Sequence, residues 1–321
     1  MKLIISLIII FSVYSCNNAE KKGTKNDSSQ KELKGRISIS GAFALYPITV
    51  RWAEEFKKIH PKVVIDISAG GAGKGMTDAL TQMVDIGMFS RNIRKAEKDK
   101  GAWWVAVAKD AVLPTINVKN PLISQLKTKG ISKKIFIDIF INNKIKYWEE
   151  CFGDKEGKNK MNIYTRSDAC GAAEMWAQYL GGHQEGLSGI GVFGDPGIAD
   201  ALRKDKNGIG YNNIIYIYDN YSREKYNGID VIPIDLNENG IIDEEEKFYT
   251  NLDKIMEAIK AGKYPSPPAR DLYLVSKGKP ERSIVIVFLK WILTEGQKYL
   301  NEAGYTQLPE DKIQEEIKKL N

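Results

Sequence analysis

The stretches RISISGAFALYP (residues 36–47) and VVIDISAGGAGKGM (residues 63–76) decide the fold. Each opens with residues typical of a strand, isoleucines alternating with serines in the first and Val-Val-Ile-Asp-Ile in the second, and then passes through glycine and alanine. After the first, apolar residues recur near helical spacing, at Leu45, Ile48, Trp52, Phe56 and Ile59. Strands that alternate with helices indicate βαβ units and a parallel sheet, whose ligand crevice lies beyond the carboxyl ends of the strands. The sequence therefore predicts an α/β fold.

Outward from these stretches, the chain is long enough for two lobes. It has 321 residues, more than one ordinary core accommodates. Residues 103–108 resemble a buried strand, and residues 112–121 are extended and contain two prolines, which predicts a crossover. The proline-rich residues 264–268 predict the return crossover. We expect lobe 1 at residues 36–113 and 269–321 and lobe 2 at residues 114–268, each a sheet flanked by helices, joined by two crossover strands that form a hinge.

The first residues predict export and a lipid anchor. Lys2 precedes an apolar run over residues 3–13, which is too short to span a bilayer and fits a signal peptide. The run ends in Ser15-Cys16, which resembles the bacterial lipobox, whose cysteine is acylated. We expect residues 1–16 to be a lipoprotein signal peptide ending at lipidated Cys16 and residues 17–35 to be a disordered tether. The protein is then held at the cell envelope, periplasmic or outer surface; a plain signal peptide is the alternative.

Charge and cysteine content exclude some partners. The net charge is +6, but the first 35 residues hold six lysines and three acids, so half of it lies in these residues, before the folded body. The folded body lacks the basic stripe of a nucleic-acid-binding protein, and we expect no nucleic-acid partner. Cys151 and Cys170 can pair or remain free. The two histidines form no zinc pattern.

Glycine-rich turns before helices predict an anion site. Residues 41–45, 73–76 and 164–172 each lie between a strand end and a helix start. Helix N-termini present free backbone N–H groups and partial positive charge to an oxyanion, and glycine lets the backbone approach it. Arg166, within the third turn, adds a planar donor that is always charged. Tight βα turns without a ligand are the alternative interpretation.

Six segments in order resemble one family. They are GAFALYP (41–47), GGAGKG (70–75), DIGMFSR (85–91), IF…KI…W (139–148), IGY (209–211) and RDLY…KGKP (270–280). Together they are similar to the periplasmic phosphate-binding proteins of ABC transporters, over residues 36–305. The resemblance implies a type II periplasmic-binding-protein fold and delivery of a captured solute to an ABC permease. It implies a ligand site at Ala42, Phe43, Ala44, Ala72, Gly73, Lys74, Ser90, Arg91, Arg166, Cys170, Gly171 and Ala172.

This chain departs from the family at the ligand positions. The family places serine and threonine hydroxyls where this chain has Ala42, Phe43, Ala72, Lys74, Cys170 and Ala172, and some members carry an acid at Ser90. Each hydrogen bond left unmade in a closed cleft costs about 1–3 kcal/mol. Lys74 and Arg91 favour an anion. Phosphate is the leading ligand, and another oxyanion or a small organic anion stays open.

Residues 235–246, DLNENGIIDEEE, match an EF-hand calcium loop. Glycine stands at position six, and the predicted ligands are Asp235, Asn237, Asn239, the main chain of Ile241, Asp243 and Glu246. The segment before the loop resembles a strand instead of the usual entering helix. We expect a structural Ca²⁺ in lobe 2; an acidic surface loop is the alternative.

The predicted function is capture of a small anion by a lipid-anchored, monomeric solute-binding protein of an ABC importer. An enzyme is one alternative, but no Ser/His/Asp set, close carboxylate pair or catalytic metal site is recognisable in the sequence. A surface lipoprotein that senses a ligand without transport is the other alternative. A neighbouring permease and ATPase gene pair would distinguish the importer from the sensor.

Overall fold

The structure of the protein is a computed structural model that describes residues 32–321. Residues Leu33–Asn321 form one compact unit. The predicted signal peptide, the lipidated Cys16 and nearly all of the predicted tether lie outside the described residues. The fold is α/β, as predicted: a sheet runs in the order β2-β1-β3-β11-β4-β8-β6-β7, with β9 also pairing with β4.

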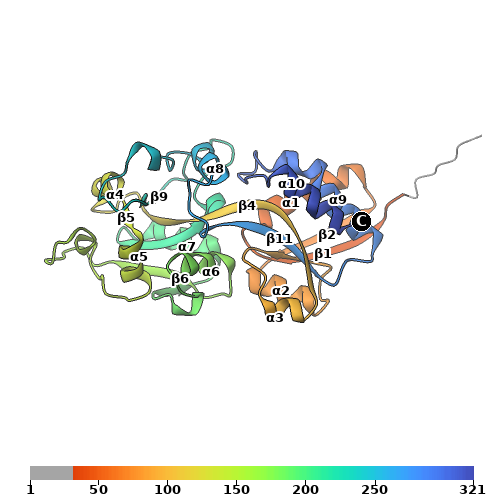
Figure 1. The fold of residues 1–321 in the computed structure, drawn as a ribbon, viewed down its shortest axis with the longest axis horizontal. Coiled ribbons are helices and arrows are strands. Elements are labelled where there is room, and N and C mark those ends of the chain that lie inside the picture. Colours follow the sequence, from red (N-terminus) through yellow and green to blue (C-terminus); the bar gives the residue numbers. More distant parts are fainter. Residues whose placement is uncertain (1–31) are drawn as a thin grey trace, which may run out of the picture. The chain divides into compact units, whose positions relative to one another are not determined.

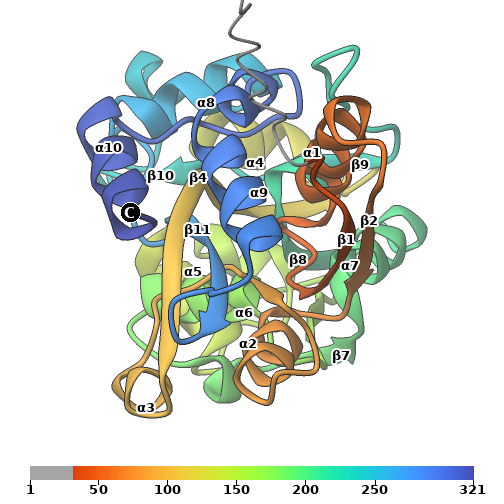
Figure 2. The ribbon, with the colours of Figure 1, turned by 90° about the vertical axis from the view of Figure 1, so that its right-hand side faces the viewer.

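Lobe 1 contains the first βαβ units and the C-terminal helices. Its elements are β1 (Gly35–Gly41), α1 (Tyr46–Ile59), β2 (Val63–Ala69), α2 (Ala72–Leu80), β3 (Ile86–Phe89), α3 (Lys95–Asp99), β11 (Ala269–Lys277), α9 (Ser283–Leu293), η5 (Glu295–Tyr299) and α10 (Glu310–Lys319). Strands β1, β2 and β3 are parallel, and β11 joins them antiparallel. Helices α1, α9 and α10 lie on one face of these strands and α2 on the other (Figures 1 and 2).

Lobe 2 holds the middle of the chain. Its elements are α4 (Ile123–Lys129), β5 (Ile131–Ser132), α5 (Lys133–Phe140), η1 (Trp148–Phe152), β6 (Asn162–Arg166), α6 (Gly171–Tyr179), η2 (Gln184–Gly186), β7 (Ile190–Val192), α7 (Gly194–Lys204), β8 (Gly208–Asn213), η3 (Ile214–Tyr216), β9 (Ile229–Val231), β10 (Ile234–Asp235), η4 (Glu244–Glu246) and α8 (Leu252–Lys260). Strands β6, β7 and β8 are parallel. They therefore repeat the arrangement of lobe 1.

The two lobes share β4 (Ala102–Asn117). Its first part pairs with β11 up to Ala111, and its second part pairs with β8 and β9 from Val112 onward. Figure 1 shows β4 and β11 running side by side between the lobes. The sequence predicted a strand over residues 103–108 and a separate crossover. The two are one strand, because β4 passes without a gap from pairing with β11 at Ala111 to pairing with β8 at Val112, in spite of Pro114.

Each lobe has its own hydrophobic core. In lobe 1, Phe56 packs edge-on against Phe288 with ring centroids 4.9 Å apart. In lobe 2, Phe136 and Phe140 pack against Trp176 at 5.1 and 5.6 Å. These separate cores make each lobe a rigid support for its share of a site between them.

The two cysteines of lobe 2 remain free. Cys151 and Cys170 are both buried, and in the described residues neither forms a disulfide. Burial raises the pKa of the Cys151 thiol to about 12. In the part of the chain that the structure covers, no helix is long and apolar enough to cross a membrane.

Candidate functional site: the cleft between the lobes

Helix starts from both lobes are in contact at one place; this junction of the lobes is called the cleft below. The N–H of Gly73, in the first turn of α2, donates to the carbonyl of Ala169 in lobe 2 at 2.9 Å. The carbonyl of Ser90 lies against Gly171 at the start of α6, so closely that an added Cβ would stand 2.1 Å from it. The first turns of both helices carry N–H groups that no helical carbonyl can reach. The structure thus brings Gly73, Ser90 and Gly171 together across the lobes.

Residues 73–76, which the sequence placed in a turn before a helix, belong to helix α2 itself, which begins at Ala72 and packs closely against strands at Gly75. A Cβ on Gly75 would lie 2.4 Å from the carbonyl of Met88 in β3 and 2.9 Å from the Cα of Gly41 in β1. The glycine-rich sequence favours a turn, whereas in the structure Gly75 permits close packing of the helix against the strands. This packing places the start of α2 directly at the carboxyl ends of β1 and β3.

Arg166 lies at the lobe 2 side of the cleft with 1% of its side chain exposed. Its Nε and Nη2 donate to the two carboxylate oxygens of Asp168 at 2.8 and 2.6 Å. Its Nη1 donates to Asp195, at the start of α7, at 2.5 Å. Burial opposes the charge, but Asp195 and Asp168 outweigh it and raise the pKa of Arg166. Of its five N–H donors these bonds use three, which leaves two for a ligand.

Phe43 covers this arginine from lobe 1. Its ring lies over the guanidinium, with the Cζ of Arg166 5.5 Å from the ring centroid. The ring also meets Phe193 of lobe 2 edge-on at 5.8 Å, and Phe193 is 61% exposed at the outer side of the pair. The hydroxyl of Tyr216 donates to the carbonyl of Phe43 at 3.0 Å. Aromatic side chains therefore shield Arg166 from water, which strengthens any charge interaction there.

Cys170 caps α6 in place of the family's hydroxyl residue. Its Sγ accepts the N–H of Ala173 at 3.3 Å, and Gln184 accepts the N–H of Cys170 itself at 3.0 Å. Burial raises the pKa of the thiol to about 11, against the opposing effect of Arg166. The thiol is neutral at physiological pH, so Cys170 adds no negative charge beside an anion.

Two predicted site residues direct their charges elsewhere. Lys74 pairs with Asp78 one turn along α2, and Ser40 donates to the same carboxylate at 2.7 Å. Arg91 forms a two-bond pair with Glu97 at 2.6 and 3.1 Å and lies over the ring of Phe89. Neither side chain reaches Arg166 in the contacts of the described residues. Ala42, Ala44, Ala72 and Ala172 are buried. Because an alanine side chain has no polar group, only the main chain of these residues can form a hydrogen bond with a ligand.

A salt bridge between the lobes flanks the cleft. Arg94 of lobe 1 donates to Glu174 of α6 at 2.8 Å. Burial alone would raise the pKa of Glu174, but the N–H of Gln184 and the charge of Arg94 lower it to about 2. The pair is therefore fully charged at neutral pH and favours the closed arrangement.

Sequence reasoning did not include Asp168, Asp195 and Phe193 among the site residues. Asp168 lies two positions after Arg166, which is a local signal for a paired arginine. Asp195 and Phe193 belong to a further strand–turn–helix unit, from β7 into α7, of the same kind as the three that were recognised. That pattern could have identified the unit, but only the tertiary structure shows that it meets Arg166.

The predicted calcium loop is organised by its own polar groups. Asp235 accepts the N–H groups of Asn239 and Gly240 at 3.2 and 2.9 Å, and Glu246 accepts that of Leu236 at 2.7 Å. Asp243 accepts the side-chain amides of Asn237 and Asn239 at 2.8 and 2.9 Å. Among residues 32–321, no three His, Cys, Asp or Glu side chains are grouped as a metal site. EF-hand loops also use amide and main-chain oxygens.

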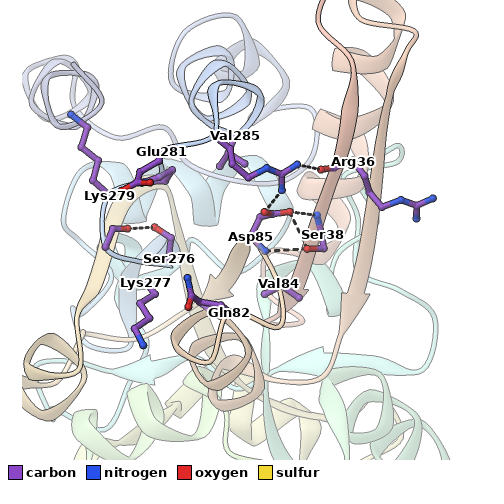
Figure 3. Close-up of a pocket in the computed structure, with 14 residues that line it drawn as sticks. Arg36, Ser38, Gln82, Val84, Asp85, Ser276, Lys277, Lys279, Glu281 and Val285 are labelled. Carbon is purple, nitrogen blue, oxygen red and sulfur yellow. Dashed lines mark hydrogen bonds and ion pairs between the residues drawn. The ribbon is translucent and has the colours of Figure 1, made fainter.

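A cavity of about 1020 Å³ lies at the other end of lobe 1 (Figure 3). It is at the amino ends of β1 and β3, where Asp85 accepts both the N–H and the hydroxyl of Ser38 at 2.8 and 3.0 Å. Arg282 pairs with Asp85 and donates to the carbonyl of Arg36 at 2.7 Å. Ligands of parallel α/β sheets bind at the carboxyl ends of strands. The cleft, not this cavity, has that position.

Comparison with known proteins identifies the family. The family model described as a PBP superfamily domain matches residues 25–295. The chain is 27% identical to a phosphate-binding protein PstS of Methanocaldococcus jannaschii, over 97% of this chain and 92% of that protein. It is 25% identical to PstS of Staphylococcus haemolyticus, over 95% and 91%.

A solved structure shows the same fold. A substrate-binding protein of a phosphate ABC transporter from Clostridium perfringens, with bound phosphate, superimposes with a TM-score of 0.69. The superposition covers 86% of this chain and 100% of the Clostridium perfringens chain, and the two sequences are 23% identical. Because the family model matches most of its length, the chain belongs to the PBP superfamily, and the superposition shows that it has the type II periplasmic-binding-protein fold.

Proposed function

We propose that the chain captures inorganic phosphate in the cleft and presents it to an ABC permease. The observation that carries this proposal is Arg166, a buried guanidinium at the end of β6, in the turn whose Ala169 accepts a hydrogen bond from Gly73 of lobe 1. The matched relatives are phosphate-binding proteins, and the solved structure named above contains phosphate. Binding, not catalysis, is what these relatives are named for.

The hydroxyl-poor cleft suits a small oxyanion held by main-chain groups. Helix α6 begins at Gly171, which lies against Ser90 of lobe 1, and α2 begins at Ala72 of lobe 1, so the first turns of both helices are near the lobe junction. Helix N-termini favour negative charge, and Arg166 has two N–H groups left over. Main-chain donors can replace the missing side-chain hydroxyls, because an oxyanion accepts from either type of donor.

A thermal-shift screen across anions tests this proposal. Phosphate at 100 times its Kd should add about 2.7 kcal/mol to the free energy of unfolding and raise Tm, because it binds only the folded state. Sulfate and small organic anions should raise Tm less at equal concentration. A larger shift with sulfate or an organic anion would assign the cleft to that anion, and no shift with any of them would contradict anion binding altogether.

We also propose that the protein is exported and anchored through Cys16. The support is the sequence alone: an apolar run that ends in Ser15-Cys16. We expect the full chain to enter the membrane fraction of a producing bacterium. Cys16→Ala should move it to the soluble fraction, and the neighbouring Asn17→Ala should not. Equal membrane retention of Cys16→Ala would rule the lipid anchor out.

We further propose that residues 235–246 bind Ca²⁺ and stabilise lobe 2. The support is the EF-hand spacing, the positive φ of 83° at Gly240, and the turns in which Asn237 and Asn239 accept N–H groups. These turns are of the kind that lets ligand oxygens face a common centre. The ligands are those predicted from the sequence.

Chelation should destabilise the protein. With saturating EGTA we expect Tm to fall by about 5 °C, since losing a ligand at 100 times its Kd removes about 2.7 kcal/mol. In calcium, Glu246→Gln should have a lower Tm than the wild type. In EGTA, the variant and the wild type should have the same Tm. Glu244→Gln, whose side chain is 86% exposed, is the matched control and should behave as the wild type. Identical melting curves of the wild type in calcium and in EGTA would sink the proposal.

A further inference from the structure

A chain of buried polar contacts links Arg166 to the hinge. Arg166 donates to Oδ2 of Asp195 at 2.5 Å, and Oδ1 of Asp195 accepts the backbone N–H of Asn213 at 3.1 Å. The side-chain oxygen of Asn213 accepts from Nη2 of Arg270. The same nitrogen donates to Asp110 at 3.2 Å. All five residues are buried.

The far end of this chain lies in the two crossover strands. Arg270 of β11 and Asp110 of β4 are direct cross-strand partners, at the last residues of β4 that pair with β11 before it turns to lobe 2. Asn213 ends β8 opposite Val112, the first residue of β4 that pairs with lobe 2. The contacts therefore run from the hinge, through lobe 2, to the proposed anion-binding arginine.

Arg270 is incompletely satisfied. Within residues 32–321, its buried Nε and Nη1 have no hydrogen-bond partner, and both of its side-chain hydrogen bonds come from Nη2. Buried polar groups in native proteins are nearly always hydrogen-bonded, so each exception requires a reason. An apolar side chain of similar volume would stabilise a hinge at least as well, because it carries no charge to desolvate. A role in fold stability alone does not account for this arginine.

We propose that Arg270 is a positioning residue for anion binding, which holds Asn213 and thereby Asp195 and the guanidinium of Arg166, so that the hinge sets the anion affinity of the cleft. This inference rests on the proposed function. In it, the position of β4 and β11 decides whether Arg166 presents its two remaining N–H groups to the ligand.

Charge at Asp110 should then modulate affinity. Arg270 from β11 donates to its carboxyl group, and Asp195 from α7 and the tyrosines Tyr216, Tyr264 and Tyr305 interact with it electrostatically. Burial raises the pKa of Asp110 to about 6, although Arg270 opposes this. As pH falls through about 6, Asp110 becomes neutral and leaves Arg270 uncompensated. The electrostatic potential at the anion site then becomes more positive, and an anion binds more tightly.

Substitutions at Arg270 separate positioning from structure. Calorimetric titration of inorganic phosphate into the full chain at pH 7.5 should show Kd raised at least tenfold in Arg270→Gln. In Arg270→Lys, which keeps the charge and one donor for Asn213, Kd should stay within about threefold of the wild type. Asn213→Ala removes only the side-chain link, since the backbone N–H to Asp195 remains, and should weaken binding as Arg270→Gln does.

The pH profile supplies a readout that a structural role would not move. The ratio of the wild-type Kd to that of Asp110→Asn should be near one at pH 5 and rise at least threefold by pH 7.5. Phosphate titrates identically for both proteins, so its own ionisation cancels in the ratio. This comparison remains decisive if Arg270→Gln or Asn213→Ala fails to fold.

Distinct outcomes overturn the inference and the proposed function. If folded Arg270→Gln and Asn213→Ala bind phosphate with the Kd of the wild type, the positioning role alone is overturned. A Kd ratio that stays flat from pH 5 to 7.5 does the same. Absence of phosphate binding by the wild-type chain at every pH overturns both.

Discussion

Arg166→Ala should weaken phosphate binding at least thirtyfold. Removing one partner of a buried charge pair at a binding site typically costs about 2–5 kcal/mol, and 2 kcal/mol corresponds to a factor of about thirty in Kd. The change also leaves Asp168 and Asp195 without a cation beside the ligand, and their repulsion adds to the loss. Titration calorimetry of the purified variant measures the effect.

Two further variants separate this loss from unfolding. Arg166→Lys keeps the charge but cannot serve both carboxylates and an anion, so it should bind more weakly than the wild type while remaining folded. Lys95→Ala removes a cation that is 87% exposed and pairs with Asp99 on the surface, and this variant should bind phosphate as the wild type does. Wild-type affinity in a folded Arg166→Ala protein would refute the assignment of the cleft.

Gly171→Ala should prevent the lobes from closing. A Cβ at this position would lie 2.1 Å from the carbonyl oxygen and 2.3 Å from the hydroxyl oxygen of Ser90, in the opposite lobe. The backbone of Gly171 does not have positive φ, and alanine favours helices, so lobe 2 itself should remain folded. We expect phosphate affinity to fall about a hundredfold, because the ligand loses the donors of lobe 1.

Gly186→Ala is the matched control for this change. It lies in the same lobe, without positive φ, and a Cβ there meets nothing within 4 Å. Its phosphate affinity and Tm should equal those of the wild type. Small-angle scattering should show Gly171→Ala with an unchanged radius of gyration on adding phosphate, whereas a compaction like that of the wild type would show that closure does not need this contact.

Local pattern predicted much of the fold. Strand, glycine turn and helix follow one another within about 20 residues over residues 36–91, so their alternation alone indicates the parallel strands of lobe 1. The continuity of β4 was not predictable, because it depends on pairing with β11 and β8, which lie far away in sequence. Propensity near Pro114 favours an interruption, and tertiary pairing overrides it.

The placement of the proposed site residues was predictable where it depends on local turns. Arg166, Gly73 and Gly171 follow from strand–turn–helix units and lie together. The anion role expected for Lys74 has less support, because its partner Asp78 stands four residues along the same helix, a pairing that the sequence already contained. Asp195 could not be assigned, since it meets Arg166 only through the packing of α7 against lobe 2.

Calorimetric titration of inorganic phosphate into the full chain tests anion capture most directly. We expect one binding site per chain with Kd of roughly 10 µM or lower, about −7 kcal/mol or more favourable. Sulfate should bind at least tenfold more weakly under the same conditions, and Arg166→Ala should show no comparable heat. Absence of binding at millimolar phosphate, or equal affinity in Arg166→Ala, would contradict the proposal that the two lobes close around phosphate at Arg166.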